Sequence, residues 1–210
     1  MFETAVVSFT TFFATVGPLD VAAMYAVLTP TASPAARRSM ALRGVMVSTI
    51  ILVTFAMIGD FILNSLGISL AALRLAGGIL LLLIGIDMVF ARDSGGTTTT
   101  DEETSEAVGK QDISVFPLAT PLIAGPGTMG AVILLMANSR GELGEQVVVV
   151  AALLVVLLIT LMLLLLAGTV HRLLGVTGLN VVSRIFGVLL TALAVQFMFD
   201  GLAASGLISP

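Results

Sequence analysis

Two glycine–proline pairs are the residues of this chain best placed to bind a small polar solute. Gly17-Pro18 and Gly125-Pro126 are 108 residues apart, and each interrupts an apolar run long enough to cross a bilayer. Proline lacks a backbone N–H and clashes with the preceding helical turn, so backbone groups are freed at each pair. Inside a membrane, freed backbone groups are tolerated only where protein or a water-filled cavity satisfies them. Two such interruptions at matching positions in two halves of a chain indicate the binding site of a transporter.

The second pair lies in an unusual segment, Phe116–Thr128, which has three prolines and two glycines. Each proline in a helix interior costs about 3 kcal/mol or more, so we expect an unwound or re-entrant segment here. A new half-helix would begin at Gly127, with Thr128 near its cap. Its free N–H groups and positive dipole end would suit a carboxylate. The alternative is a kinked helix with a structural role.

Asp20 lies just past the first pair, inside an apolar segment. A carboxylate within a membrane is energetically expensive, and it indicates a functional site. It could bind a substrate ammonium group, a proton or a sodium ion, together with Thr15 and the backbone carbonyls near Val16 and Gly17. The alternative is that Asp20 caps the new half-helix, which needs no transport chemistry.

A polar stripe precedes the first pair. Thr4, Ser8, Thr11 and Thr15 are spaced four, three and four residues apart, so they share one face of a helix. Their hydroxyls could line a substrate path, or they could bond to carbonyls of their own helix and to neighbouring helices. We expect the second role for Thr4 and Ser8, and the first for Thr11 and Thr15, which approach the break.

The composition indicates that a membrane surrounds these residues. Of 210 residues, 58% are hydrophobic and only 10% are charged, whereas a soluble domain carries roughly 25% charged residues. A helix needs about 20 apolar residues to cross the hydrocarbon. We therefore predict an all-α polytopic membrane protein with turn residues near 30–34, 64–67, 138–144 and 175–178. The six predicted transmembrane helices are 2–29, 40–63, 68–91, 113–137, 145–169 and 180–206.

Several functional classes lack the residues that they need. The absence of cysteine excludes disulfides, thiol catalysis and thiolate metal sites, and the single histidine, His171, excludes a multi-histidine metal site. No phosphate-binding loop or nucleophile triad is present. We therefore expect no enzyme activity, no bound metal and no cofactor other than a coupling ion, H⁺ or Na⁺. No feature indicates a nucleic-acid partner, and none supports an oligomer.

A polar, acidic segment at 92–112 divides the chain into two halves. Its composition predicts a flexible cytoplasmic linker between three-helix repeats at 1–91 and 113–210. Arg74-x-x-Gly77 in the first half matches Arg184-x-x-Gly187 in the second. Because each repeat has three spans, the second must cross the membrane in the opposite direction. This predicts a 3+3 inverted-topology repeat with discontinuous first and fourth helices.

The positive charges predict the orientation. With the N-terminus outside, seven of the nine Lys and Arg residues fall on the cytoplasmic side, and only Arg74 and Arg140 fall outside. Cytoplasmic loops carry the excess of positive charge, so we expect both termini to lie outside.

The motif F-P-L-A-T-P-L-I-A-G-P-G-T at 116–128 strongly resembles the signature of the MarC family. The segments G-I-S-L at 67–70, L-R-L-A-G-G at 73–78 and S-R-I-F-G at 183–187 also resemble this family. The resemblance covers the chain except for the linker. The family is named for multiple antibiotic resistance and includes SnatA-type transporters of small neutral amino acids.

The resemblance implies a six-span inverted repeat with broken first and fourth helices. It also implies transport of small neutral amino acids such as glycine, alanine or serine, driven by protons or sodium. The first segment departs from the family pattern, which usually has Asn or Asp immediately before the proline. Here Gly17 takes that position, Asp20 stands where glycine is expected, and Ala23 replaces a second proline.

The breaks and the family resemblance together indicate a secondary active transporter that works by alternating access, and the resemblance implies small neutral amino acids as its substrates. Its expected location is the inner membrane of a prokaryotic cell, with the lipid bilayer and the substrate as its partners. The alternatives are a channel-like pore for a small solute or ion, and a membrane subunit without flux. The candidate substrate-binding residues are Thr15, Val16, Gly17, Pro18, Asp20, Thr120, Gly125, Pro126, Gly127 and Thr128.

Overall fold

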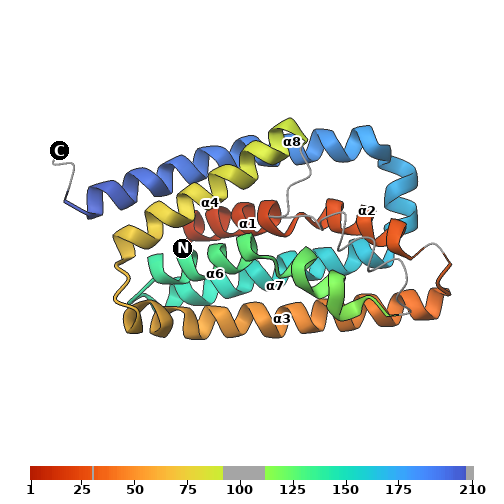
Figure 1. Cartoon of the computed structure of the whole chain (residues 1–210), viewed down its shortest axis with the longest axis horizontal. Coiled ribbons are helices and arrows are strands. Elements are labelled where there is room, and N and C mark those ends of the chain that lie inside the picture. Colours follow the sequence, from red (N-terminus) through yellow and green to blue (C-terminus); the bar gives the residue numbers. More distant parts are fainter. Residues whose placement is uncertain (30, 92–111, 207–210) are drawn as a thin grey trace.

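A computed structural model gives the arrangement of the chain (Figure 1). It describes residues 1–29, 31–91 and 112–206, and within them the side chains other than those at 60, 168–177 and 179. Except for Asp112, the predicted linker lies outside these residues. The described part is helical, without strands: α1 Phe2–Val16, α2 Pro18–Leu28, α3 Pro34–Ser65, α4 Leu70–Phe90, η1 Ser114–Ile123, α6 Pro126–Asn138, α7 Leu143–Leu165 and α8 Ala167–Ala204.

Several helix starts follow directly from the sequence. Pro34 is the first residue of α3, where its missing N–H costs nothing, and the Ser33 hydroxyl accepts a hydrogen bond from the Ala36 N–H at 3.2 Å. Ser69 caps α4 in the same way, accepting from the Ala72 N–H at 3.1 Å. The predicted joins near 64–67 and 138–144 are confirmed, because α3, α4, α6 and α7 end or begin at them.

The predicted join at 175–178 is wrong, because α8 is helical from Ala167 to Ala204. Only Leu166 separates α7 from α8. Glycine in a helix interior costs only about 1 kcal/mol relative to alanine, and without a proline the backbone hydrogen bonds continue. Figure 1 shows α8 curving around one end of the bundle before it runs back along α4.

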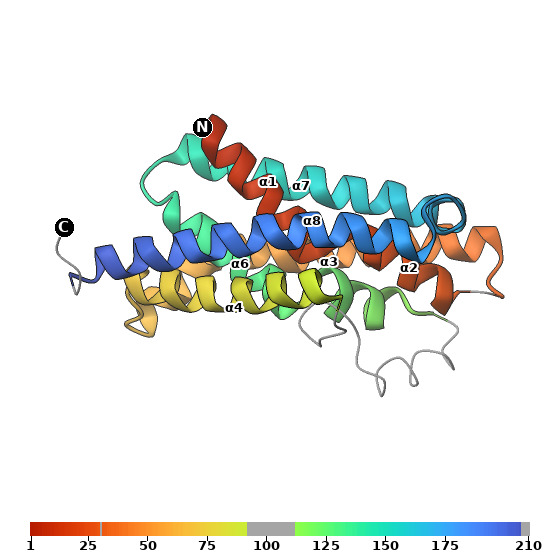
Figure 2. The same ribbon diagram turned by 90° about the horizontal axis from the view of Figure 1, so that it is seen from above.

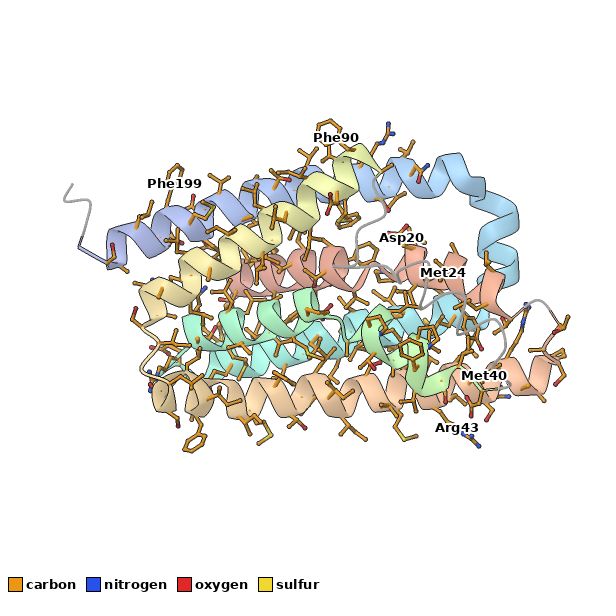
Figure 3. The ribbon with its side chains drawn as sticks, viewed as in Figure 1. Asp20, Met24, Met40, Arg43, Phe90 and Phe199 are labelled. Carbon is orange, nitrogen blue, oxygen red and sulfur yellow. The ribbon has the colours of Figure 1, made fainter. Side chains whose placement is uncertain are left out.

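The described helices include five that are long and apolar enough to cross a membrane, within Phe2–Leu28, Pro34–Gly59, Leu70–Phe90, Leu143–Leu165 and Asn180–Ala204. The pair η1 and α6, which is bent by 54°, makes a sixth if it is counted as one span. Large apolar side chains cover the outside, among them Phe90 and Phe199, which project away from the bundle in Figure 3. The chain is therefore an all-helical, multi-pass membrane protein.

The helices alternate in direction along the long axis of the bundle (Figure 1). In this view α1, α4 and α7 run one way, and α3, α6 and α8 run the other way. The N-terminus and the described end of α8 lie toward the same end of the bundle. Residues Phe12, Leu52, Leu81, Leu118 and Leu153 are among the buried side chains that fill the interior.

An antiparallel seam joins α4 to α8, which lie side by side in Figure 2. Gly85 of α4 faces Gly187 of α8, so that a Cβ placed on Gly187 would lie 3.0 Å from the Gly85 carbonyl oxygen. Farther along, Gly78 lies against Ala194, and Gly201 lies against Ala71. Small residues let membrane helices approach this closely, since they place little beyond the backbone at the interface.

Candidate functional site

The first helical segment is interrupted at Gly17. α1 ends at Val16, Gly17 has a left-handed backbone (φ 58°, ψ 58°), and α2 begins at Pro18. This conformation is accessible to glycine and rare for other residues. Pro18 has no N–H for the Ala14 carbonyl, and no described backbone N–H donates to the carbonyls of Ala14 or Val16. The break therefore leaves backbone acceptors in the interior of the bundle.

The second interruption lies between η1 and α6. The backbone of η1 is extended at Phe116 and Thr120, as its prolines require, and α6 begins at Pro126 with Gly125 as its N-cap. Among the described residues, no backbone carbonyl accepts from the N–H groups of Gly127 or Thr128. The start of α6 thus presents two backbone donors at the positive end of a helix.

The two interruptions touch each other. The Thr128 hydroxyl donates to the Thr15 carbonyl oxygen at 3.1 Å, and both residues are buried. In an unbroken helix that carbonyl would accept from the N–H of Leu19, which does not reach it here. The Thr15 hydroxyl turns back to the Thr11 carbonyl at 2.9 Å. Thr128 lies near the cap of its own helix, as predicted, and its hydroxyl reaches across to α1.

Asp20 lies beside the first break, as the third residue of α2. The Ser183 hydroxyl of α8 donates to both of its carboxylate oxygens, at 3.0 Å and 2.8 Å. A Cβ placed on Gly17 would lie 3.3 Å from Oδ2 of Asp20. The position in the first turn of a helix favours a negative charge through the helix dipole. In Figure 3 Asp20 projects from α2 toward α8.

A small cavity adjoins the Asp20 carboxylate. Its walls include Phe13, Gly17, Met88, Ser183 and Phe186, and the rings of Phe13 and Phe186 lie 4.3 Å apart between centroids. The cavity volume available to the centre of a water molecule is about 10 Å³, which is room for roughly one water molecule. An amino acid would not fit unless these walls separated.

The structure thus brings the predicted residues of the two breaks together through Thr15 and Thr128. Val16, Pro18, Gly125 and Gly127 are buried beside them. Two predicted residues stand apart: Pro126 is exposed, and Thr120 forms no hydrogen bond to the first break in the described structure.

Ser183 was missed as a site residue. The only sequence signal was its place in the S-R-I-F-G segment at 183–187, which also supplies Phe186. In the part of the chain that the structure describes, no three His, Asp or Glu side chains gather closely enough to hold a metal ion.

The two far ends of the first interrupted segment, the start of α1 and the end of α2, are anchored to other helices. At the start of α1, the Thr4 hydroxyl donates to the Glu145 carboxylate of α7 at 3.0 Å, and the N-terminal ammonium group lies 3.3 Å from the same oxygen. At the end of α2, Arg37 of α3 donates through Nε to the Thr29 carbonyl at 2.9 Å. The Tyr25 hydroxyl donates to the Arg37 carbonyl.

Comparison with known proteins places this arrangement in a family. Residues 2–205 match the model of the "MarC family integral membrane protein". The chain is 35% identical over 197 residues to the UPF0056 membrane protein MJ1677 of Methanocaldococcus jannaschii, covering 94% of this chain and 95% of the relative. It is 32% identical over 202 residues to the UPF0056 membrane protein YvbG of Bacillus subtilis, covering 96% and 95%.

A third relative, the UPF0056 membrane protein YhcE of Escherichia coli, is 32% identical over 190 residues, covering 90% of this chain and 87% of the relative. No solved structure matches the chain. The names of these prokaryotic relatives describe a membrane protein and give no substrate. The family match spans both breaks and all the described helices, and the chain belongs to the MarC family of integral membrane proteins.

Proposed function

We propose that this protein is a secondary active transporter of small neutral amino acids, of the glycine, alanine and serine class, which works by alternating access. The observation that carries the proposal is the contact between the two interruptions, where the buried Thr128 hydroxyl meets the Thr15 carbonyl at 3.1 Å. Backbone donors of α6 and backbone acceptors of α1 converge there. Irregular backbone at membrane depth is tolerated where it lines a polar site.

The proposal includes a 3+3 inverted repeat, formed by the halves 1–91 and 113–210. The first helix of each half, which is the first and the fourth of the chain, is discontinuous. Two observations support it. Each helix of the first half runs opposite to its counterpart in the second, α1 to α6, α3 to α7 and α4 to α8 (Figure 1). The third helices of the halves also form the antiparallel glycine seam. Transporters with this architecture bind their substrates at the interface between repeats.

The two ends of an amino acid would find complementary groups at the breaks. The N–H groups of Gly127 and Thr128, at the positive end of α6, suit the carboxylate. The ammonium group would be held by Asp20 and by the Val16 carbonyl, which has no described backbone donor. The glycines at the breaks let the protein backbone approach the substrate closely. This close approach leaves no room for a large substrate side chain, so it favours a small one.

Binding requires that the cavity beside Asp20 enlarge from its present room for about one water molecule. The Phe13–Phe186 ring pair forms part of its wall and would have to separate. We infer that the structure represents a closed arrangement between two open ones. A proton or a sodium ion at Asp20 would supply the coupling, and the inner membrane of a prokaryotic cell, with both termini outside, would be its location.

Uptake of radiolabelled glycine or alanine into proteoliposomes tests the proposal. We expect saturable uptake driven by a proton or sodium gradient, and counterflow when unlabelled substrate is present inside. Asp20→Asn should lower the initial rate by roughly tenfold or more, because a hydrogen bond to a charged group contributes about 1.5–3 kcal/mol. Gly127→Leu should abolish uptake by filling the space beside the α6 donors.

Asp200→Asn is the matched control. Asp200 accepts a hydrogen bond from Gln196 of the same helix at 2.8 Å, away from the breaks, so its substitution should leave uptake unchanged. Wild-type uptake retained in both site variants would reject the proposed site. Saturable flux without counterflow would favour a channel-like pore, and folded protein without any flux would favour a membrane subunit.

A further inference from the structure

Two hydroxyl groups in the interior of α1 have no partner in the described structure. Ser8 and Thr11 have 0% exposed surface, and neither the Ser8 Oγ nor the Thr11 Oγ1 makes a hydrogen bond. Most hydroxyls on these helices donate to the carbonyl four residues earlier, as Thr15 does to Thr11. Buried polar groups almost always make hydrogen bonds, so two unpaired hydroxyl groups on one face of a helix require an explanation.

The two unpaired hydroxyls lie between a partly exposed carboxylate and the breaks. On one side, Thr4 donates to Glu145, whose side chain is 34% exposed. On the other side, the Thr15 carbonyl accepts from Thr128. From Thr4 to Thr15 the helix rises about 16 Å, roughly half the thickness of the hydrocarbon. The polar stripe therefore runs from one end of the bundle to the place where the breaks meet.

Packing alone gives no reason for hydroxyls at these two positions. Alanine in place of Ser8 and valine in place of Thr11 would keep the shape of each side chain and remove an unpaired polar atom. Water would supply the missing partners if α1 separated from the helices it packs against, α6, α7 and α8. On a helix, residues three apart have Cβ atoms about 5–6 Å apart, so a single water molecule can bridge them.

We propose that the stripe formed by Thr4, Ser8, Thr11 and Thr15 is one wall of a water-filled access path, which is shut in the closed arrangement. The path leads from the end of the bundle where Glu145 lies to the breaks. On opening, water enters and pairs with Ser8 and Thr11. The path takes water and small polar solutes without net charge, because hydroxyls are the only polar side chains along this face between Glu145 and the breaks. This inference rests on the proposed transport function.

Cysteine accessibility tests the path, and the natural chain contains no cysteine that would interfere. Ser8→Cys and Thr11→Cys are compared in lipid nanodiscs, where a membrane-impermeant methanethiosulfonate reagent reaches both faces. Leu143→Cys, at the exposed first residue of α7, is the positive control. Val6→Cys, on the outer surface of α1, and Ala56→Cys, buried in α3, are the negative controls.

We expect Ser8→Cys and Thr11→Cys to react at least tenfold faster than both negative controls. Equal rates at all four positions, or no reaction at Ser8 and Thr11 while Leu143→Cys reacts, would overturn the path. Labelling does not depend on substrate identity. Labelling without amino acid flux would therefore leave the path standing and reject the transport proposal, and flux without labelling would do the reverse.

A second variant covers the case in which a cysteine variant does not fold. Thr11→Val keeps the shape of the side chain and removes its hydroxyl. We expect at least a tenfold loss of flux in proteoliposomes, with thermal stability equal to or above that of the natural protein, and recovery of flux in Thr11→Ser. Flux unchanged in Thr11→Val would contradict a role for the hydroxyl in the path.

Discussion

Replacing Gly187 with alanine would insert a methyl group into the seam between α4 and α8. Its Cβ would lie 2.8 Å from the Cβ of Met88, 3.0 Å from the Gly85 carbonyl oxygen and 3.0 Å from the Val89 nitrogen. These are backbone and Cβ atoms, so a change of rotamer cannot relieve the contacts and the helices must separate. Overpacking of this kind typically costs about 1–3 kcal/mol.

Alanine is favoured over glycine in a helix interior by about 1 kcal/mol, which offsets part of this cost and leaves about 0–2 kcal/mol. For a chain of this length, 1 kcal/mol changes the melting temperature by roughly 2–4 °C, so we expect Gly187→Ala to lower it by up to about 8 °C. Gly130→Ala is the matched control, because a Cβ at Gly130, inside α6, would meet nothing within 4 Å. Alanine is favoured over glycine in a helix by about 1 kcal/mol, so this control should melt roughly 2–4 °C higher than the natural protein.

Far-ultraviolet circular dichroism of the protein in a mild detergent is the suitable assay, because the chain has neither tryptophan nor cysteine for fluorescence or thiol-dye methods. The apparent melting temperatures are compared at one heating rate, since unfolding of such proteins is commonly irreversible. If Gly187→Ala melted at or above the temperature of the Gly130→Ala control, the close approach of α4 and α8 would be refuted.

Two further predictions concern single polar groups. Thr128→Val removes the hydroxyl that donates to the Thr15 carbonyl and leaves a buried acceptor unpaired. It should lower the free energy of unfolding by about 1–3 kcal/mol, whereas Thr128→Ser should keep the natural melting temperature. Equal melting temperatures of the two variants would contradict this reasoning. Hydrogen bonds from Ser114 hold the pKa of Asp112 below its usual value, with a smaller contribution from Arg43. Because the pKa of Asp112 is lower in the folded state than in the unfolded state, its charged form stabilises the folded protein at pH values above the ordinary aspartate pKa. This stabilisation is lost as the pH falls through the pKa of the folded state. Asp112→Asn should therefore melt at a lower temperature than the natural protein at neutral pH. The difference should be small because the Asp112 side chain is half exposed, and it should vanish in acid. A difference that does not depend on pH would contradict this reasoning.

Single residues indicate several helix starts, and the start of α6, predicted at Gly127, lies one residue earlier at Pro126. Pro18, Pro34 and Pro126 are each the first residue of a helix, and the serines before α3 and α4 cap them. Hydropathy alone did less well, because it detects the part of a helix that lies in hydrocarbon. It placed the start of the second span at residue 40, whereas α3 begins at Pro34 and includes the polar residues Arg37 and Arg38.

The contacts that form the candidate site could not be predicted from the sequence. Thr128 and Thr15 are 113 residues apart, and Ser183 and Asp20 are 163 residues apart. A hydroxyl can bond to its own helix, to a neighbouring helix or to water, so its type does not identify its partner. The predicted join at 175–178 failed for a related reason, since glycines permit a turn without requiring one.

The anchored ends of α1 and α2 have a mechanical consequence for the residue between them. The start of α1 is bonded to α7 through Glu145, and the end of α2 is bonded to α3 through Arg37. Gly17 alone separates the two helices, and its left-handed backbone already turns the chain out of the helical path. Displacement of α3 would thus be transmitted through α2, and displacement of α7 through α1, to the same single residue beside the Asp20 carboxylate.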